Sequence, residues 1–311
     1  LSITNIGSDD ENLTIENLGQ IPEYTLQTNS GDTTLMFQDS GLTGDSDDLV
    51  INLEGAEAGS TIALTKSAGS TTETIETVSL VTGSVANTLT NLLTTAVGTT
   101  TIEITGDENL TIVTALDSEI TTVSAGDLTG DLSIIMATVD EDAAGVTTSY
   151  TVTTGSGDDT IAATVAGDDT IDSGDGADSI SSGDGNDSIS AGAGDDTIDG
   201  TDGSDWIDGG SGDDSITSAA TGTNASTIYG GEGADTITGA AIANFIDGEE
   251  GDDRIVAAAG AVNDSLVGGA GDDTFAFTND GTAGDEGDDV SANSYYTAND
   301  TVTAGTGTDT L

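Results

Sequence analysis

The sequence predicts an all-β fold, a parallel β-solenoid whose second part is a flattened β-roll. Three observations lead to this fold class. The nine-residue pattern G-G-x-G-x-D-x-(Ile/Phe)-x recurs through the second half of the chain, largely back to back. Short runs elsewhere alternate Ile, Val or Leu with Thr or Ser, which is a strand composition. Pro22 is the single proline, and the chain has no runs typical of helices.

Residues 1–152 form the first part, which is rich in Thr, Leu and Ile. Apolar residues at Ile112, Val123 and Ile134 follow one another at intervals of eleven residues. Short runs at that interval favour solenoid coils over a globular sandwich for residues 72–152. Over residues 1–70 the spacing is irregular, so a solenoid and a β-sandwich both remain open there.

Residues 153–311 form the second part, in which one apolar residue recurs mostly every nine residues. The series is Ile161, Ile171, Ile180, Ile189, Ile198, Ile207, Ile216, Ile228, Ile237, Ile246, Ile255, Leu266 and Phe275. Extra residues between some copies are expected in turns, because a slip within a strand would turn its apolar side chain outward. The register breaks at about 276–301, which is predicted to be an acidic, solvated insertion.

The composition restricts both the partners and the chemistry. There are 58 acidic residues against Lys66 and Arg254, which gives a net charge of -56. We therefore expect cations as partners, no nucleic acid and no membrane insertion. High acidity with few aromatic residues also suits a disordered chain, but the alternating apolar runs argue against it. The chain has no Cys and no His, which excludes disulfides, His-based metal sites and Ser-His-Asp triads.

The repeat brings the aspartates of successive coils together. Two nonapeptides on opposite sides make one coil of 18 residues, so each loop aspartate lies above the one 18 residues away. The predicted stacks are Asp169, Asp187 and Asp205 on one edge, Asp178, Asp196 and Asp214 on the other, and Asp235 with Asp253 as a later pair. Two carboxylates at about 5 Å repel by roughly 3 kcal/mol at an effective dielectric of about 20. The coils are therefore expected to close only around a cation.

Calcium is the expected cation, with several ions bound. It accepts six or more oxygens from carboxylates and loop carbonyls, whereas magnesium requires a smaller octahedron and transition metals favour His and Cys. Folding and calcium binding are then one coupled event. The candidate metal-site residues are the aspartates Asp159, Asp169, Asp178, Asp187, Asp196, Asp205, Asp214, Asp235, Asp253, Asp264 and Asp273, and the glycines Gly174, Gly176, Gly183, Gly185, Gly192, Gly194, Gly210, Gly212, Gly231, Gly233, Gly269 and Gly271.

The copies of the repeat differ at the aspartate position. Ser226 and Asn244 occupy it in two copies, which we expect to bind calcium weakly or not at all. Several copies also carry an aspartate one position earlier, which is expected to contribute a backbone carbonyl and surface charge. These residues are Asp158, Asp168, Asp195, Asp213, Asp252 and Asp272. Asx-turns would explain the aspartates of a single copy, but the array favours a metal.

The segments Gly209–Ile216 and Gly268–Phe275 resemble the calcium-binding nonapeptides of RTX (repeats-in-toxin) proteins, also called hemolysin-type repeats. The resemblance covers residues 154–275 and, in part, 303–311. It implies a right-handed parallel β-roll, folding outside the cell and export by type I secretion. Because residues 304–311 begin another copy, we expect the sequence to be a segment of a longer polypeptide.

The first part narrows the expected function. Its runs Ile75–Leu80, Thr101–Ile112 and Val123–Ile134 are similar to the Thr-rich β-solenoid of RTX-containing bacterial S-layer proteins. That resemblance implies an extracellular, cell-surface structural protein, which self-associates into a calcium-bridged lattice or filament. The alternative is an RTX adhesin, or the non-catalytic β-roll region of a secreted enzyme or toxin. An enzyme is not expected, because the chain has no Gly-x-Ser-x-Gly, His-Glu-x-x-His or P-loop motif.

Overall fold

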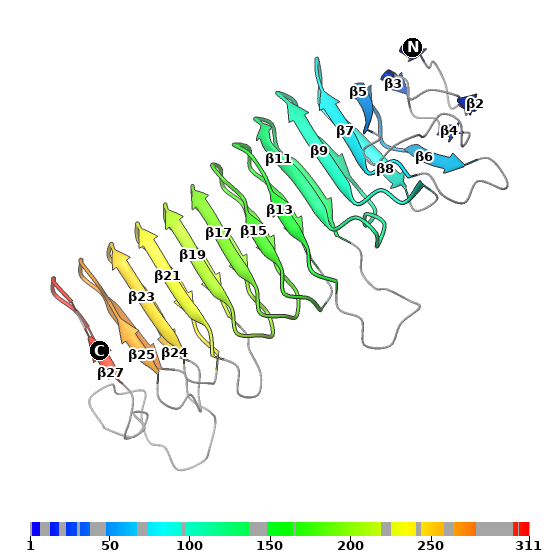
Figure 1. Ribbon diagram of the computed structural model, residues 1–311. Coiled ribbons are helices and arrows are strands. Elements are labelled where there is room, and N and C mark those ends of the chain that lie inside the picture. Colours follow the sequence, from blue (N-terminus) through cyan, green and yellow to red (C-terminus); the bar gives the residue numbers. More distant parts are fainter. Residues whose placement is uncertain are drawn as a thin grey trace. The chain divides into compact units, whose positions relative to one another are not determined.

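A computed structural model of the protein consists of β-strands and the turns between them (Figure 1). It describes residues 2–6, 13–18, 23–29, 32–37, 48–66, 74–94, 97–136, 148–163, 166–218, 225–240, 244–257, 264–277, 301–303 and 305–310. No helix in this part of the chain is long and apolar enough to cross a membrane. The chain divides into two compact units, Leu1–Val165 and Ala166–Leu311.

The first unit contains strands β1 to β14. Their bounds are β1 Ser2–Ile6, β2 Leu13–Leu18, β3 Glu23–Asn29, β4 Thr33–Phe37, β5 Asp48–Ala56, β6 Ser60–Lys66, β7 Thr77–Thr82, β8 Asn87–Leu93, β9 Thr101–Gly106, β10 Leu110–Ile112, β11 Thr122–Leu128, β12 Leu132–Ile135, β13 Thr151–Thr153 and β14 Thr160–Ala162. Each odd-numbered strand pairs in parallel with the next odd one, and each even-numbered strand with the next even one. The pairing begins at β1 and β2, so the strands before residue 67 also follow solenoid coils. The antiparallel pairing of a sandwich is not found among them.

The second unit contains strands β15 to β27. Their bounds are β15 Thr170–Asp172, β16 Ser179–Ser181, β17 Ser188–Ala193, β18 Thr197–Asp199, β19 Trp206–Ser211, β20 Ser215–Thr217, β21 Thr227–Glu232, β22 Thr236–Thr238, β23 Phe245–Glu250, β24 Arg254–Ala257, β25 Ser265–Val267, β26 Thr274–Phe277 and β27 Thr301–Thr303. Odd strands again pair with odd and even with even, all in parallel. The predicted all-β parallel solenoid is confirmed.

The core of the second unit is the predicted series of apolar residues. In the odd sheet, Ile189 pairs with Ile207 and Ile207 with Ile228, and in the even sheet Ile198 pairs with Ile216. Every member of the series from Ile171 to Phe275 is at most 2% exposed. The Ser, Thr and Asp residues on either side of them point outward, because neighbouring side chains alternate along a strand. The nine-residue period therefore keeps one apolar side chain inside at each strand.

The insertions between copies lie at one edge of the second unit. We call the turns that lead from an odd strand to the next even strand the odd-to-even edge, and the other turns the even-to-odd edge. Across the odd-to-even edge every apolar step is nine residues, from Ile171 to Ile180 through to Leu266 to Phe275. Across the even-to-odd edge the steps lengthen at 216–228 and 255–266. The longer steps therefore fall between strands and not within them, and always between an even strand and the next odd one.

The predicted acidic insertion falls between β26 and β27 in the sequence. Its boundaries differ slightly from expectation, because Ala276 and Phe277 still belong to β26 and Thr301 begins β27. Residues 278–300 lie outside the described residues. After them β27 pairs directly with β25, with Leu266 opposite Val302, so the coil resumes in register.

Candidate metal centre

A column of aspartates runs along the odd-to-even edge of the second unit. Each aspartate donates its backbone N–H to Oδ1 of the aspartate one coil later, over N to O distances of 2.7–3.2 Å. The members of this odd-to-even column are Asp178, Asp196, Asp214, Asp235, Asp253, Asp273 and Asp309. Asp178 to Asp273 are at most 2% exposed. The structure thus joins the two predicted stacks Asp178 to Asp214 and Asp235 to Asp253 into one column.

Asp309 is a column member that the sequence reasoning left out of its candidates. Its Oδ1 accepts the Asp273 N–H at 3.2 Å, although the two residues are 36 apart in the chain. The run Gly305-Thr306-Gly307-Thr308-Asp309 fits the repeat and could have identified it. The missing information was that the coil after residues 278–300 returns to the same stack.

A second column lies at the even-to-odd edge, and it changes character along its length. Asp169 donates its N–H to Oδ1 of Asp187 at 2.8 Å, and Asp187 does the same to Asp205 at 3.1 Å. The next acceptors are Ser226 Oγ at 3.1 Å and Asn244 Oδ1 at 3.3 Å, followed by Asp264 Oδ1 at 2.8 Å. This even-to-odd column therefore keeps its backbone hydrogen bonds through Ser226 and Asn244 but loses its charge there.

The side chains of the two neutral members of the even-to-odd column, Ser226 and Asn244, also form hydrogen bonds with residues a few positions earlier in the chain. Ser226 Oγ is 3.1 Å from Ser218 Oγ, and the Asn244 side-chain NH2 donates to the Ala240 carbonyl at 2.9 Å. Both side chains are buried. A neutral hydroxyl or amide is therefore accommodated where other coils place a carboxylate.

The second carboxylate oxygen, Oδ2, differs from Oδ1 in its hydrogen bonding. Within the described part of the chain, Oδ2 of several column aspartates is buried without a hydrogen-bond partner; they are Asp187, Asp196, Asp214, Asp235, Asp253 and Asp273. Burial raises the pKa of Asp196 and Asp235 to about 6, and that of Asp205, Asp214 and Asp253 to about 7. A buried, charged oxygen without a partner is costly unless a cation or a proton reaches it.

Backbone carbonyl oxygens approach these unpartnered oxygens. A methyl group placed on Gly230 would lie 2.3 Å from Asp235 Oδ2 and 2.8 Å from the carbonyl oxygen of Gly248, one coil later. At Gly248 the corresponding distances are 2.2 Å to Asp253 Oδ2 and 2.5 Å to the carbonyl oxygen of Gly268. A side chain there would collide with both oxygens, which explains why the first position of these copies is glycine.

The donor set fits calcium. It consists of carboxylate and carbonyl oxygens, which are the ligands that calcium prefers. No group of three or more carboxylates close enough for one ion occurs among the residues that the structure describes. An ion at this edge would therefore take carbonyl oxygens as well as the column aspartates.

The predicted loop glycines have the backbone conformation that tight loops require. All twelve, from Gly174 to Gly271, have positive φ values between 88° and 151°. Two copies place another residue at the second position, Thr201 with φ 33° and Glu249 with φ 71°. Each is held by an aspartate two residues earlier, because Asp199 Oδ1 and Asp247 Oδ1 accept their N–H groups at 3.2 Å.

The fifth-position aspartates lie outside the buried columns. All of them are exposed. In five of them, Asp168, Asp195, Asp213, Asp252 and Asp272, Oδ1 accepts a backbone N–H from the following coil, for example from Asn186 to Asp168 at 2.8 Å and from Asp272 to Asp252 at 2.7 Å. These bonds run in the opposite direction along the stack to those of the columns. Successive coils are therefore joined twice at each such turn, once inside and once at the surface.

Asp159 is the candidate that lies in the first unit. It is 1% exposed, and its Oδ1 accepts the Leu132 N–H at 2.7 Å. Burial raises its pKa. Its surroundings therefore resemble those of the column aspartates in the second unit.

Comparison with known proteins supports the metal assignment. Residues 153–276 and 296–311 match the family model of the RTX calcium-binding nonapeptide repeat, in overlapping segments 153–189, 164–198, 181–216, 217–241, 229–262, 259–276 and 296–311. Searches of curated proteins and of solved structures found no match. The match therefore covers the repeats, and residues 1–152 lie outside it.

Proposed function

Because residues 153–276 and 296–311 carry RTX calcium-binding nonapeptide repeats, we propose that the chain is an extracellular structural protein that folds and assembles on binding calcium. The observation that carries the proposal is the odd-to-even column, in which buried Oδ2 atoms without partners recur at successive coils. Such a column is hard to form without bound cations. RTX repeats are typically non-catalytic, and the proposed role is accordingly structural.

The aspartates and the glycines of the repeat have different roles in binding calcium. Column aspartates accept the backbone N–H of the preceding coil on Oδ1 and leave Oδ2 for the ion. Glycines at the first and second positions keep the loop open to carbonyl oxygens of the neighbouring coil. When bound, calcium supplies the positive charge that offsets the buried carboxylates, so binding stabilises the stacked coils.

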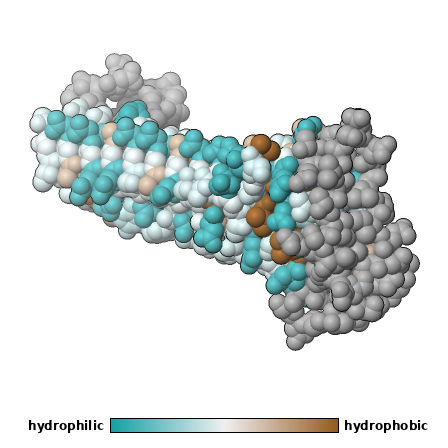
Figure 2. Space-filling view, turned by 90° about the horizontal axis from the view of Figure 1, so that it is seen from above, coloured by the Kyte–Doolittle hydropathy of each residue, from teal (hydrophilic) through white to brown (hydrophobic). Residues whose placement is uncertain are grey.

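Assembly follows from the charge of the surface. Hydrophilic residues recur along the side of the molecule seen in Figure 2, which is the side of the odd-to-even edge. With a net charge of -56, neighbouring copies repel one another unless cations lie between them. We propose that calcium bridges copies into a surface layer or filament, for which export by type I secretion would place the protein at the cell surface.

The proposal is tested by circular dichroism of the metal-free chain titrated with calcium and, separately, with magnesium. We expect a coil-to-β transition with calcium, and with magnesium only a weak response. Light scattering on the same samples should rise with calcium and fall again when a chelator is added. A fully formed β-spectrum in excess chelator would overturn the coupling of folding to calcium. Assembly that is equal with and without chelator would overturn the structural role.

A further inference from the structure

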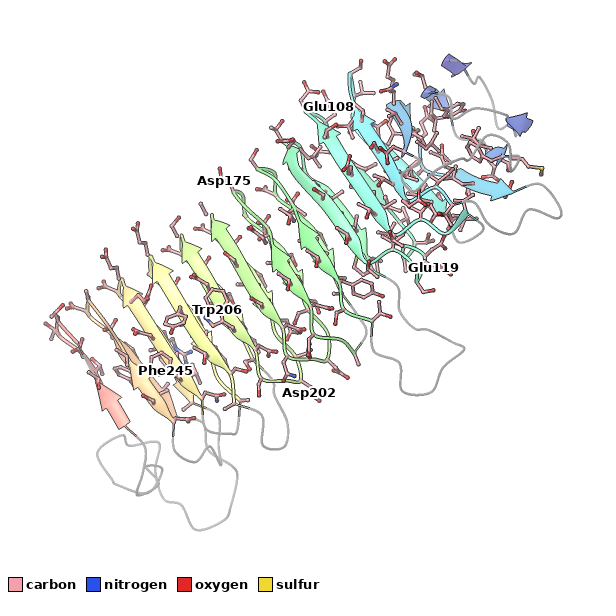
Figure 3. All side chains as sticks on the ribbon, viewed as in Figure 1. Glu108, Glu119, Asp175, Asp202, Trp206 and Phe245 are labelled. Carbon is pink, nitrogen blue, oxygen red and sulfur yellow. The ribbon has the colours of Figure 1, made fainter. Side chains whose placement is uncertain are left out.

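Three aromatic side chains gather on the outer face of the odd sheet in the second unit. Trp206, Tyr229 and Phe245 come from the successive odd strands β19, β21 and β23. Figure 3 labels Trp206 and Phe245. Their ring centroids are 6.3 Å apart for Trp206 and Tyr229 and 5.8 Å for Tyr229 and Phe245. Trp206 is 41% exposed, although large apolar groups are usually buried. We call these three residues the aromatic cluster.

Acidic residues adjoin the aromatic cluster. Asp208 and Asp247 pair with Tyr229 from the two neighbouring strands. Burial raises the pKa of Asp208 and of Glu249, and the pKa of Glu249 is raised further by the negative charges of Asp247 and Asp208. The cluster therefore combines ring faces, which attract cations, with carboxylates that repel one another.

Arg254 is the only arginine in the chain, and it lies on the other sheet. It begins β24, where it pairs with Thr236 on one side and Thr274 on the other. The corresponding positions of earlier even strands are Ser or Thr, so Arg254 is the one long side chain in a row of short hydroxyls. It is exposed, and Ile255 beside it points into the core. No ion pair is formed by Arg254 with any residue that the structure describes.

We infer that Arg254 of one copy docks on the aromatic cluster of a second copy and pairs there with Asp208 and Asp247. A guanidinium group stacks on aromatic faces and binds carboxylates with two parallel hydrogen bonds, so it suits both halves of this surface. This inference rests on the proposed self-association of the chain, and it identifies the residues through which two copies meet. A second copy is the favoured partner because the same unit carries both complementary groups on opposite faces.

The geometry of this contact has a consequence for assembly. Arg254 and the aromatic cluster lie on the outer faces of different sheets. Two copies that meet through the same face therefore cannot bring Arg254 of one copy to the aromatic cluster of the other. Each copy would offer an arginine to one neighbour and a cluster to another. Such a heterologous contact repeats without closing and leads to extended arrays.

The test uses the calcium-saturated chain and its single tryptophan, Trp206, as the probe. Self-association is measured by sedimentation over a range of concentrations, together with the fluorescence of Trp206. Arg254→Gln should weaken association at least about tenfold, as expected for an arginine at the centre of an interface. Arg254→Lys should recover only part of the loss, because an ammonium group lacks the planar fork. Thr274→Gln, a long neutral side chain on the next strand of the same row, is the matched control and should change little.

A mixing experiment separates the two halves of the contact. Arg254→Gln keeps the cluster, and Asp208→Asn with Asp247→Asn keeps the arginine, so each variant alone should stay largely monomeric. Mixed together, they should form pairs with a change in Trp206 fluorescence of the Arg254→Gln partner. Calcium-dependent association that is unaffected by Arg254→Gln would overturn the contact but not the structural role. The absence of any calcium-dependent association would overturn both.

Discussion

At the scale of single residues, the two oxygens of a column aspartate have separate tasks. In Asp253, Oδ1 accepts the backbone N–H of Asp235 at 2.9 Å, and Oδ2 is buried without a hydrogen-bond partner. The identity of the aspartates was predictable, because the repeat places them at one position. Which oxygen holds the neighbouring coil depends on the rotamer and the register, and sequence spacing specifies neither.

Asp253 and its neighbour Asp252 allow this division to be tested. Asp253→Asn keeps an oxygen acceptor and removes the buried charge, so the calcium concentration at the midpoint of folding should rise severalfold. Without calcium this variant should be at least as stable as the parent, because Asn244 shows that an amide fits the position. The measurement is circular dichroism against calcium concentration, together with the β-signal that remains in excess chelator.

Asp252→Asn is the matched control, since it removes the same charge one residue earlier from an exposed side chain. Its calcium midpoint should stay close to that of the parent, because exposed charges contribute little. Equal shifts in the two variants would show that net charge, and not the buried oxygen, determines calcium binding.

At the scale of elements, the two edges of the second unit are unequal. Across the odd-to-even edge the apolar step is always nine residues, and the turns carry an aspartate at each described coil from Asp178 to Asp273. The even-to-odd turns contain every insertion and the two neutral residues Ser226 and Asn244. In Figure 3, Asp175 marks the first edge and Asp202 the second. Metal binding is therefore expected to be continuous on one edge and interrupted on the other.

Restoring aspartate at the interrupted edge provides a direct test. The double variant Ser226→Asp and Asn244→Asp should bind more calcium than the parent, measured by equilibrium dialysis. Without calcium it should be less stable, because each substitution adds a buried charge next to an existing column. Ser204→Asp, at a fifth position of the same edge, is the control and should leave the amount of bound calcium unchanged. A double variant with unchanged calcium content would mean that the longer turns, and not the side chains, prevent binding there.

At the scale of the whole molecule, the negative charge of the chain destabilises the folded state until cations or protons bind. The described columns bury carboxylates in a chain of net charge -56, and burial raises the pKa of Asp205, Asp214 and Asp253 to about 7. The ordinary pKa of an aspartate in an unfolded chain is about 3.9. The folded state therefore binds more protons than the unfolded state between these two values.

The consequence is that acid should partly replace calcium. In chelator, the stability of the folded state should increase as the pH falls from about 7 to about 4, and decrease as the pH rises through the raised pKa values. Circular dichroism against pH in chelator measures this directly. A metal-free chain whose β-signal is constant or falls over this range would contradict the raised pKa values. With calcium present the dependence should reverse, because protons and calcium compete for the same oxygens.

The sequence by itself determined the period of the repeat, the apolar residue of each strand and the aspartates that stack, because all three follow from a fixed spacing along the chain. The fold of residues 153–275 and the positions of Ser226 and Asn244 were predictable for the same reason. Irregular spacing left the first 70 residues open between a solenoid and a sandwich, and the described strands among them, β1 to β6, pair in parallel as in a solenoid. Only the tertiary structure placed the insertions at one edge, returned Asp309 to its column across 36 residues and brought Trp206, Tyr229 and Phe245 together. Those features depend on which strands pair after each insertion, and pairing is set by burial and hydrogen bonding between coils.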